Sequence, residues 1–184
     1  MIALIFTIIL TTLLFLVFKE YERRNINTHQ AITSNYLTAA LLTLLIGGNN
    51  YNPIMIVNTD WFLPTIALGV FFIVMFNIMA LTTQRLGISI GSMASKMSLI
   101  IPVIGAIIFQ NETLDFYKII GIIIAVIAVY LTFKKSGTNT KNLVLAITLF
   151  IGAGILDMWL DLIRNNYLSS NIEFNQFIFT VFFT

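Results

Sequence analysis

Lys96 is the residue of this sequence whose position most directly suggests chemistry. It lies inside an apolar run, Ile88–Phe109, with about eight residues of the run before it and thirteen after. A charge at that depth in a bilayer costs roughly 2.5–3.5 kcal/mol and usually faces a cavity or a partner. We interpret Lys96 as a counter-charge for an anionic substrate group or as a proton-coupled site. The alternative is a lysine that reaches the interface, or that pairs with Asp157 or backbone carbonyls, for packing only.

Pro102 lies in the same run and has no backbone N–H. Its ring displaces the carbonyl of Ser98, which predicts a kink with a free carbonyl close to Lys96. Kinked helices near the bilayer midplane often form transporter sites. The alternative is an ordinary proline kink whose carbonyl is satisfied by the hydroxyl of Ser95 or Ser98. Ser92 is four residues before Lys96, so the two share a face that we expect to line a cavity.

Two further polar residues lie within apolar runs. Asn77 is an amide deep in the run Trp61–Thr82, and it either lines the pathway or bonds a neighbouring helix. Asp157 lies towards the end of the run Leu143–Ile163 and is a candidate partner of Lys96 or a coupling site for a proton or sodium ion.

Small residues recur at helical spacing on two of the runs. Gly87, Gly91 and Ser95 are four residues apart, as are Gly121 and Ala125. Such stripes let membrane helices approach closely. We therefore assign these five residues to helix packing rather than to substrate contact.

The composition excludes several classes of chemistry. The chain has no cysteine and a single histidine, His29, so we predict no thiolate or histidine metal site and no catalytic triad. It carries no HExxH or nucleotide-binding motif. The net charge is +2 and the basic residues form no stripe, so nucleic acid is not an expected partner. We predict a protein that is not an enzyme and needs no cofactor.

The elements that position these residues are apolar and long. Of the 184 residues, 58% are hydrophobic and 10% charged, whereas soluble domains carry about 25% charged residues. The lipid bilayer must therefore be part of the solvent, and we predict an all-α, polytopic membrane helix bundle. At 1.5 Å per residue even the shortest run spans roughly 25 Å. The runs are Ile2–Phe18, Ala31–Gly47, Trp61–Thr82, Ile88–Phe109, Tyr117–Phe133 and Leu143–Ile163.

Three features describe how the runs are organised. A seventh run begins at Phe177 and reaches Thr184, too short to cross, so we expect a fragment cut within its seventh span. The polar stretch 134–141 predicts a boundary between two structural halves. Trp61 and Tyr117 begin helices and fit an interfacial aromatic belt. Basic residues gather in the loops after the first, third and fifth runs, which the positive-inside rule places in the cytoplasm, with the N-terminus outside.

The stretch from Trp61 to Lys135 also carries a family resemblance. It contains the stretch 77–81, a small-residue stretch (91–103) that includes Pro102, a turn with Glu112 and Leu114, and a glycine-led helix of small residues (121–131). In this order the features resemble the EamA-like branch of the drug/metabolite transporter superfamily. Asn111 stands where that pattern has glycine.

The resemblance implies ten spans in two inverted five-helix halves, with both termini in the cytoplasm, in contrast to the loop charges. Residues 1–135 would be the first half and 136–184 the linker and incomplete start of the second. It implies a multi-pass secondary transporter of the cytoplasmic (inner) cell membrane that moves a small metabolite, amino acid or drug by alternating access. The chain alone would then be inactive unless it forms a homodimer. The alternative is a membrane scaffold or assembly protein that transports nothing.

Overall fold

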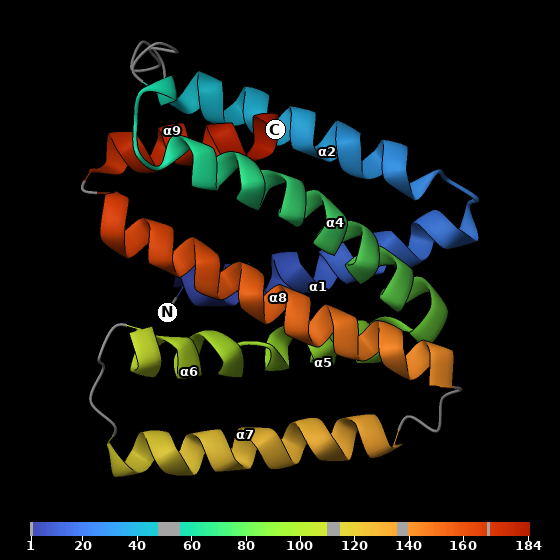
Figure 1. The fold of residues 1–184 in the computed structure, drawn as a ribbon. Coiled ribbons are helices and arrows are strands. Elements are labelled where there is room, and N and C mark those ends of the chain that lie inside the picture. Colours follow the sequence, from blue (N-terminus) through green and yellow to red (C-terminus); the bar gives the residue numbers. More distant parts are fainter. Residues whose placement is uncertain (1, 48–55, 110–114, 136–139, 169) are drawn as a thin grey trace.

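The fold is built from helices that alternate in direction. The computed structural model describes residues 2–47, 56–109, 115–135, 140–168 and 170–184, and the labelled elements in these ranges are all α-helices (Figure 1). The expected all-α class is therefore confirmed for these residues. The helices are α1 (Ile2–Arg23), α2 (Thr28–Gly47), α4 (Phe62–Leu86), α5 (Ile88–Met97), α6 (Ile100–Phe109), α7 (Phe116–Lys135), α8 (Thr140–Tyr167) and α9 (Asn171–Phe183).

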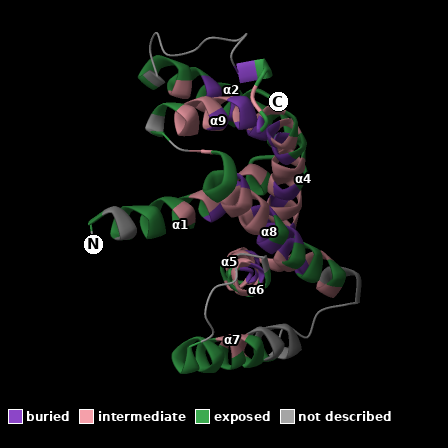
Figure 2. Ribbon diagram, turned by 60° about the vertical axis from the view of Figure 1, so that its left-hand side comes forward, coloured by how far each residue is buried: buried purple, intermediate pink, exposed green. Residues whose placement is uncertain are grey.

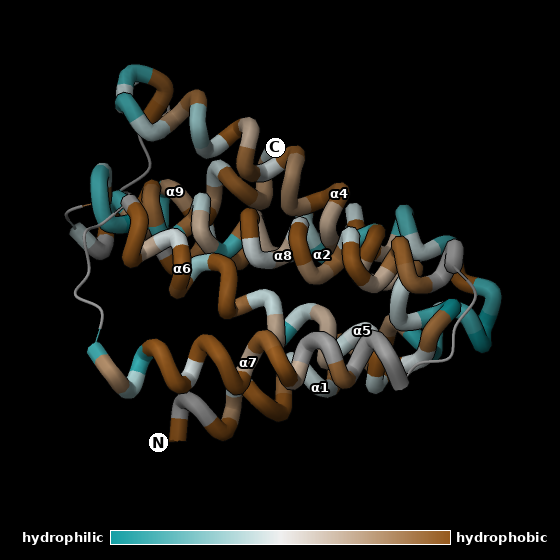
Figure 3. Tube along the Cα trace, turned by 60° about the horizontal axis from the view of Figure 1, so that its bottom comes forward, coloured by the Kyte–Doolittle hydropathy of each residue, from teal (hydrophilic) through white to brown (hydrophobic). Residues whose placement is uncertain are grey.

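Among the residues that the structure describes, three segments are long and apolar enough to cross a membrane. They are Phe62–Leu86, Ile88–Ile108 and Leu143–Tyr167, which correspond to α4, to α5 with α6, and to α8. Phe116–Ala128 and Ile172–Phe183 are apolar but shorter. The most hydrophilic positions gather towards the two ends of the bundle, with mostly apolar helix between them (Figure 3). This distribution supports a membrane protein.

Successive helices run back and forth between the two ends of the bundle, with α5 and α6 running in the same direction (Figure 1). As a result α1 runs opposite to α8, and α2 runs opposite to α9. Arg24, after α1, and Arg85, in the last turn of α4, lie at one end of the bundle. Asp60 and Asp115, before α4 and α7, lie at the other. The arginines of these two loops therefore lie at the end opposite to Asp60 and Asp115, although Glu20 and Glu22 lie near the first end and Lys118 and Arg164 near the second.

The core lies where α4, α8 and α9 meet. Leu68 of α4, Leu149 of α8 and Phe177 of α9 are almost completely buried there. Trp61 belongs to this core, with only 3% of its surface exposed and its ring centroid 6.3 Å from that of Phe177, so its predicted place in an interfacial belt is wrong. A second cluster, which includes Tyr36, joins α1, α2 and α4.

The predicted halves, 1–135 and 136–184, share the first of these cores. Helices α8 and α9 pack against α4 and α2 rather than standing apart from them. The junction at 136–139, like the predicted turn at Glu112 and Leu114, lies outside the described residues.

Of the three glycines predicted to pack helices together, Gly91 lies against a neighbouring helix, whereas Gly87 and Gly121 do not. A Cβ atom on Gly91 would lie 2.6 Å from Thr83 Oγ1, so α5 and α4 approach closely at this point. Gly87 instead links α4 to α5 with φ of 91°, and a Cβ there would meet nothing within 4 Å. Its role is the turn, because L side chains rarely adopt positive φ. Gly121 also has open space around it, so its predicted role in packing is wrong.

Helix α7 lies at the edge of the bundle (Figures 1 and 2). Its main contacts are with α5 and α6, and its first residues, 116–121, are all exposed. Helix α9 also differs from expectation, since it begins at Asn171 and not near Phe177. Its first turn is polar and is fixed by a capping box between Ser170 and Glu173.

Candidate functional site

The apolar segment Ile88–Ile108 is not one continuous helix. Helix α5 ends at Met97 and α6 begins at Ile100, so the break lies at Ser98 and Leu99. In an unbroken helix the carbonyl of Ser98 would accept from residue 102, but proline has no N–H. The backbone N–H of Ile101 bonds that carbonyl instead, at 2.9 Å. The predicted free carbonyl is therefore wrong, and the break lies before Pro102 rather than at it.

Lys96 projects from the last turn of α5, beside this break. Its side chain is exposed, and its Nζ donates to Thr11 Oγ1 of α1 at 3.4 Å. Within the described part of the chain Lys96 forms no ion pair, so the predicted pairing with Asp157 is not present. A long bond to one hydroxyl leaves most of the hydrogen-bonding capacity of an ammonium group unused.

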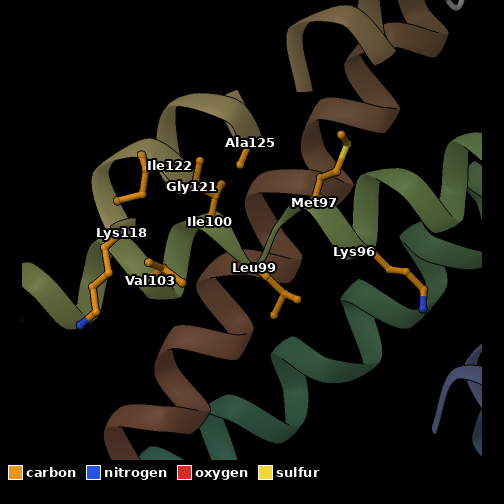
Figure 4. A pocket seen from close by; sticks show the side chains of 9 residues that line it. All are labelled: Lys96, Met97, Leu99, Ile100, Val103, Lys118, Gly121, Ile122 and Ala125. Atoms are coloured by element: carbon orange, nitrogen blue, oxygen red, sulfur yellow. The ribbon is translucent and has the colours of Figure 1, made fainter. Parts of the chain in front are cut away.

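A groove of about 360 Å³ lies beside the break, between α5–α6 and α7. Lys96 and Lys118 lie at opposite ends of its lining with mainly aliphatic side chains between them, and the ammonium group of Lys96 extends away from the groove towards α1 (Figure 4). Gly121 faces it from α7 and contributes no side chain. The lining residues are Lys96, Met97, Leu99, Ile100, Val103, Lys118, Gly121, Ile122 and Ala125.

A second cavity, of about 270 Å³, lies between the start of α2 and the end of α4. It is lined by Thr28, His29, Asn77, Ile78, Leu81 and Gln84. The Nδ2 of Asn77 donates to the carbonyl of Ile73 at 2.8 Å, while its Oδ1 is buried without a partner among the described residues. The sequence pointed to Asn77 but not to Thr28 or His29. The turn between α1 and α2 brings Thr28 and His29 to the cavity, and no local sequence pattern predicts this placement.

The five predicted pathway residues do not converge on one site. Lys96 lines the first cavity and Asn77 the second. Pro102 lies in the first turn of α6, and the hydroxyl of Ser92 bonds the carbonyl of Ser89 in its own helix, at 3.1 Å. Asp157 is half-buried on α8 and forms no hydrogen bond or ion pair within the described residues. The groove beside Lys96 is the stronger candidate site, because there a charged residue lies beside a helix break in a segment apolar enough to cross a membrane.

The two remaining residues predicted to pack helices, Ala125 and Ser95, lie at the groove and beside the helix break. Ala125 lines the groove, and the carbonyl of Ser95 accepts from the hydroxyl of Ser98 at 2.5 Å. No group of three or more potential metal ligands occurs among the residues that the structure describes. The described lining of the two cavities thus offers hydroxyl, amide, imidazole, ammonium, thioether and aliphatic groups.

Comparison with known proteins identifies one uncharacterised relative. The chain is 28% identical over 166 residues to an uncharacterised protein of Haemophilus influenzae (strain ATCC 51907 / DSM 11121 / KW20 / Rd). The match covers 84% of this chain and 56% of the relative, so the chain spans just over half of that protein's length. No protein-family model matches the chain, and no solved structure matches it with significance.

Proposed function

We propose that this chain is part of a multi-pass secondary transporter that moves a small metabolite, amino acid or drug across the cytoplasmic (inner) cell membrane by alternating access. The observation that carries the proposal is Lys96 beside the break between α5 and α6, in a segment apolar enough to span a bilayer. Transporters commonly place their sites at such interruptions, where a charged group meets the ends of two half-helices. Inserting a charged lysine into a bilayer costs free energy, so a lysine at this position indicates that its charge has a function.

The directions of four helices support an inverted repeat. Helices α1 and α2 run opposite to α8 and α9, as a second copy entering from the other face of the membrane requires (Figure 1). Helices α2 and α9, equivalent in that scheme, pack against each other. An element that lies next to a two-fold axis packs against its own counterpart, so the contact between α2 and α9 is where the axis would pass.

On these grounds we propose that the chain belongs to the EamA-like drug/metabolite transporters. It would hold the first five-helix half and the start of the second. The proposed mechanism is the rocking of one half against the other around a site near Lys96, with a proton or sodium ion as the coupling ion.

Uptake into vesicles tests the transport proposal. We expect the purified protein in proteoliposomes to accumulate a labelled solute from a panel of amino acids, metabolites and cationic or anionic drugs. Lys96→Ala is expected to lower uptake about tenfold or more, since it removes the intramembrane charge. Arg23→Ala removes a cation that is exposed at the end of α1 and is expected to leave uptake unchanged. Absence of flux for every solute class, or equal flux in both variants, would contradict the proposal.

A scaffold or assembly protein is the second candidate function. The observation that favours it is α7, whose first turns are exposed at the edge of the bundle, where a partner helix has room to pack. A scaffold would copurify with a stoichiometric partner and show no flux, which separates the two candidates.

A further inference from the structure

We infer that a third cavity, the groove between α1 and α2, binds a membrane phospholipid with an anionic headgroup. One acyl chain would lie in the groove and the phosphate group at Arg24. The groove has a volume of about 270 Å³ and is formed by one face of α1, the start of α2 and Phe76 of α4. It is separate from the groove beside Lys96, and binding of a lipid there does not depend on transport.

The groove exists because α1 and α2 diverge after the turn that joins them (Figures 1 and 2). Helix α1 packs mainly against α4 and α5, and α2 mainly against α9, so these consecutive helices have little contact with each other. Phe76 closes the bottom of the groove, where its ring packs edge-on against those of Phe18 and Tyr36. Leu10 and Leu13 line the groove and are each about half exposed. The groove is therefore open to the lipid that surrounds a membrane protein.

The length and volume of the groove fit one chain of a lipid. Its lining on α1 runs from Leu10 to Tyr21, which is roughly 16 Å at 1.5 Å per residue. The hydrocarbon core of a bilayer is about 30 Å thick, so this length corresponds to one leaflet. The volume lies below the roughly 300–1,000 Å³ of sites that enclose a whole small molecule. The groove thus suits part of a larger amphipathic molecule better than a complete soluble solute.

Arg24 continues the face of α1 that lines the groove. Val17 and Tyr21 belong to the lining, and Arg24 follows Tyr21 by three residues, a spacing that keeps side chains on one helix face. The backbone N–H of Arg24 bonds the carbonyl of Glu20 at 3.0 Å, so helical hydrogen bonding extends to this residue. Tyr21 lies between the aliphatic lining and the arginine, and tyrosine rings favour the headgroup level of a bilayer. Arg24 is therefore placed where the phosphate of a lipid in the groove would lie.

The charges at this end of α1 leave a cation for the phosphate. The Nε of Arg24 donates to Glu20 Oε1 at 2.6 Å, and the side chain of Arg24 is 69% exposed. Arg23 forms a looser ion pair with the same carboxylate, at 3.7 Å. One carboxylate compensates only one of two guanidinium groups, so a net positive charge remains. A guanidinium group has five N–H donors and can bind a phosphate with two of them while Nε stays on Glu20.

Photo-crosslinking tests the inference. The purified protein in dodecyl maltoside micelles is irradiated with phosphatidylglycerol that carries a diazirine in one acyl chain, and the labelled peptides are mapped by mass spectrometry. We expect labelling around Leu13 and Asn35, on the two walls of the groove. Unlabelled phosphatidylglycerol should displace the probe about fivefold more effectively than phosphatidylcholine, as for one net charge near a headgroup. Arg24→Gln is expected to lower labelling about tenfold, through loss of a charged hydrogen bond.

Two matched controls separate a defined site from general attraction. Arg23→Gln removes the same charge one residue earlier, on a face of α1 turned away from the groove, and should retain most of the labelling. Ala31→Phe fills the groove from α2 and should abolish labelling, whereas Leu37→Phe adds its ring at an exposed position outside the lining and should not.

Four results would overturn the inference. They are equal losses in Arg23→Gln and Arg24→Gln, equal displacement by phosphatidylcholine, full labelling of Ala31→Phe, and displacement by sn-glycerol 3-phosphate, which would assign Arg24 to a soluble anion. Arg24 is exposed, so Arg24→Gln is expected to keep the fold, and the comparison with Arg23→Gln decides the outcome even if Ala31→Phe does not fold.

Discussion

The backbone of α8 lies directly against the helix break, with Gly154 facing the carbonyl oxygen of Ser98. A Cβ atom on Gly154 would be 2.8 Å from that oxygen and 2.6 Å from Cβ of Ile101. Lipid offers no hydrophobic drive for helices to associate, so close packing of this kind is a main source of their stability. The break beside Lys96 is therefore supported by a helix more than forty residues later in the chain.

The first prediction concerns this contact. Gly154→Ala is expected to destabilise the protein by roughly 1–3 kcal/mol, because the added methyl group meets backbone that cannot move aside. Thermal unfolding in detergent, followed by circular dichroism, measures the change. Gly152→Ala should cost less, since its new neighbour is the flexible end of Met75. Gly121→Ala has open space and should be neutral or stabilising by up to about 1 kcal/mol. Equal effects at all three glycines would contradict the close approach.

The hydroxyl of Tyr36 gives a second prediction. Tyr36 is 4% exposed, its ring packs edge-on against Phe76 and Phe182, and its hydroxyl has no partner among the described residues. A buried hydroxyl without a partner costs about 1–3 kcal/mol, so Tyr36→Phe should leave stability unchanged or raise it. Tyr36→Ala should lower stability by roughly 3–5 kcal/mol through loss of the ring. Chemical denaturation of both variants tests this, and a marked loss in Tyr36→Phe would reveal a hidden partner.

Gln84 gives a third prediction, because it joins three helices. Its Nε2 donates to the carbonyl of Phe18 in α1 at 3.2 Å and to Thr28 Oγ1 in α2 at 2.9 Å. Gln84→Leu should cost roughly 1–3 kcal/mol for the two lost bonds. It should also speed amide hydrogen exchange around the turn between α1 and α2. Gln30→Leu alters an exposed residue of α2 and serves as the control. Unchanged exchange in Gln84→Leu would show that the turn is held by other contacts.

The capping box of α9 gives a fourth prediction. Ser170 Oγ accepts from the backbone N–H of Glu173 at 3.2 Å, and Glu173 Oε2 accepts from that of Ser170 at 3.1 Å. Ser170→Ala should cost about 1 kcal/mol. Because the two bonds support the same turn, the losses in Ser170→Ala and Glu173→Ala should not add in the double variant. A double-mutant cycle by thermal unfolding measures the coupling, and strict additivity would contradict it.

The helices were predictable because their apolar runs are long, but their ends were not. Helix α1 continues past its apolar run to Arg23. Near this end, Glu20 forms an ion pair at 2.6 Å with Arg24, four residues further along the chain. Helix α9 begins six residues before its predicted apolar run, in a polar turn that only the capping pattern identifies. Charged and polar residues can extend a helix beyond the bilayer, and a search for apolar runs stops short of them.

The candidate site was predictable in part. The depth of Lys96 in its run is visible in the sequence, but its hydrogen bond to Thr11 joins residues 85 positions apart. Helical periodicity fixes which face a residue occupies and not which helix covers that face. The same limit explains Trp61, whose place at a helix start suggested the interface although α9 buries it. The position of Pro102 predicted the helix break only to within one turn. The carbonyl of Ser98, which proline cannot pair, accepts a hydrogen bond from the backbone N–H of Ile101 instead.

The pairing of α4 with α8 and α9 has a consequence for how the protein is made. These partners emerge from the ribosome only after α5, α6 and α7, and the first of them, α8, ends about 80 residues of chain beyond the end of α4. At roughly 5–20 residues per second, α8 is complete on the order of 4–16 s after α4, and α9 follows later. During that interval lipid or the insertion machinery must shield residues such as Leu68 and Met75. Final assembly of the bundle is therefore a late, post-insertion event, and slowed translation between α4 and α8 should lengthen exposure of the nascent protein to quality control.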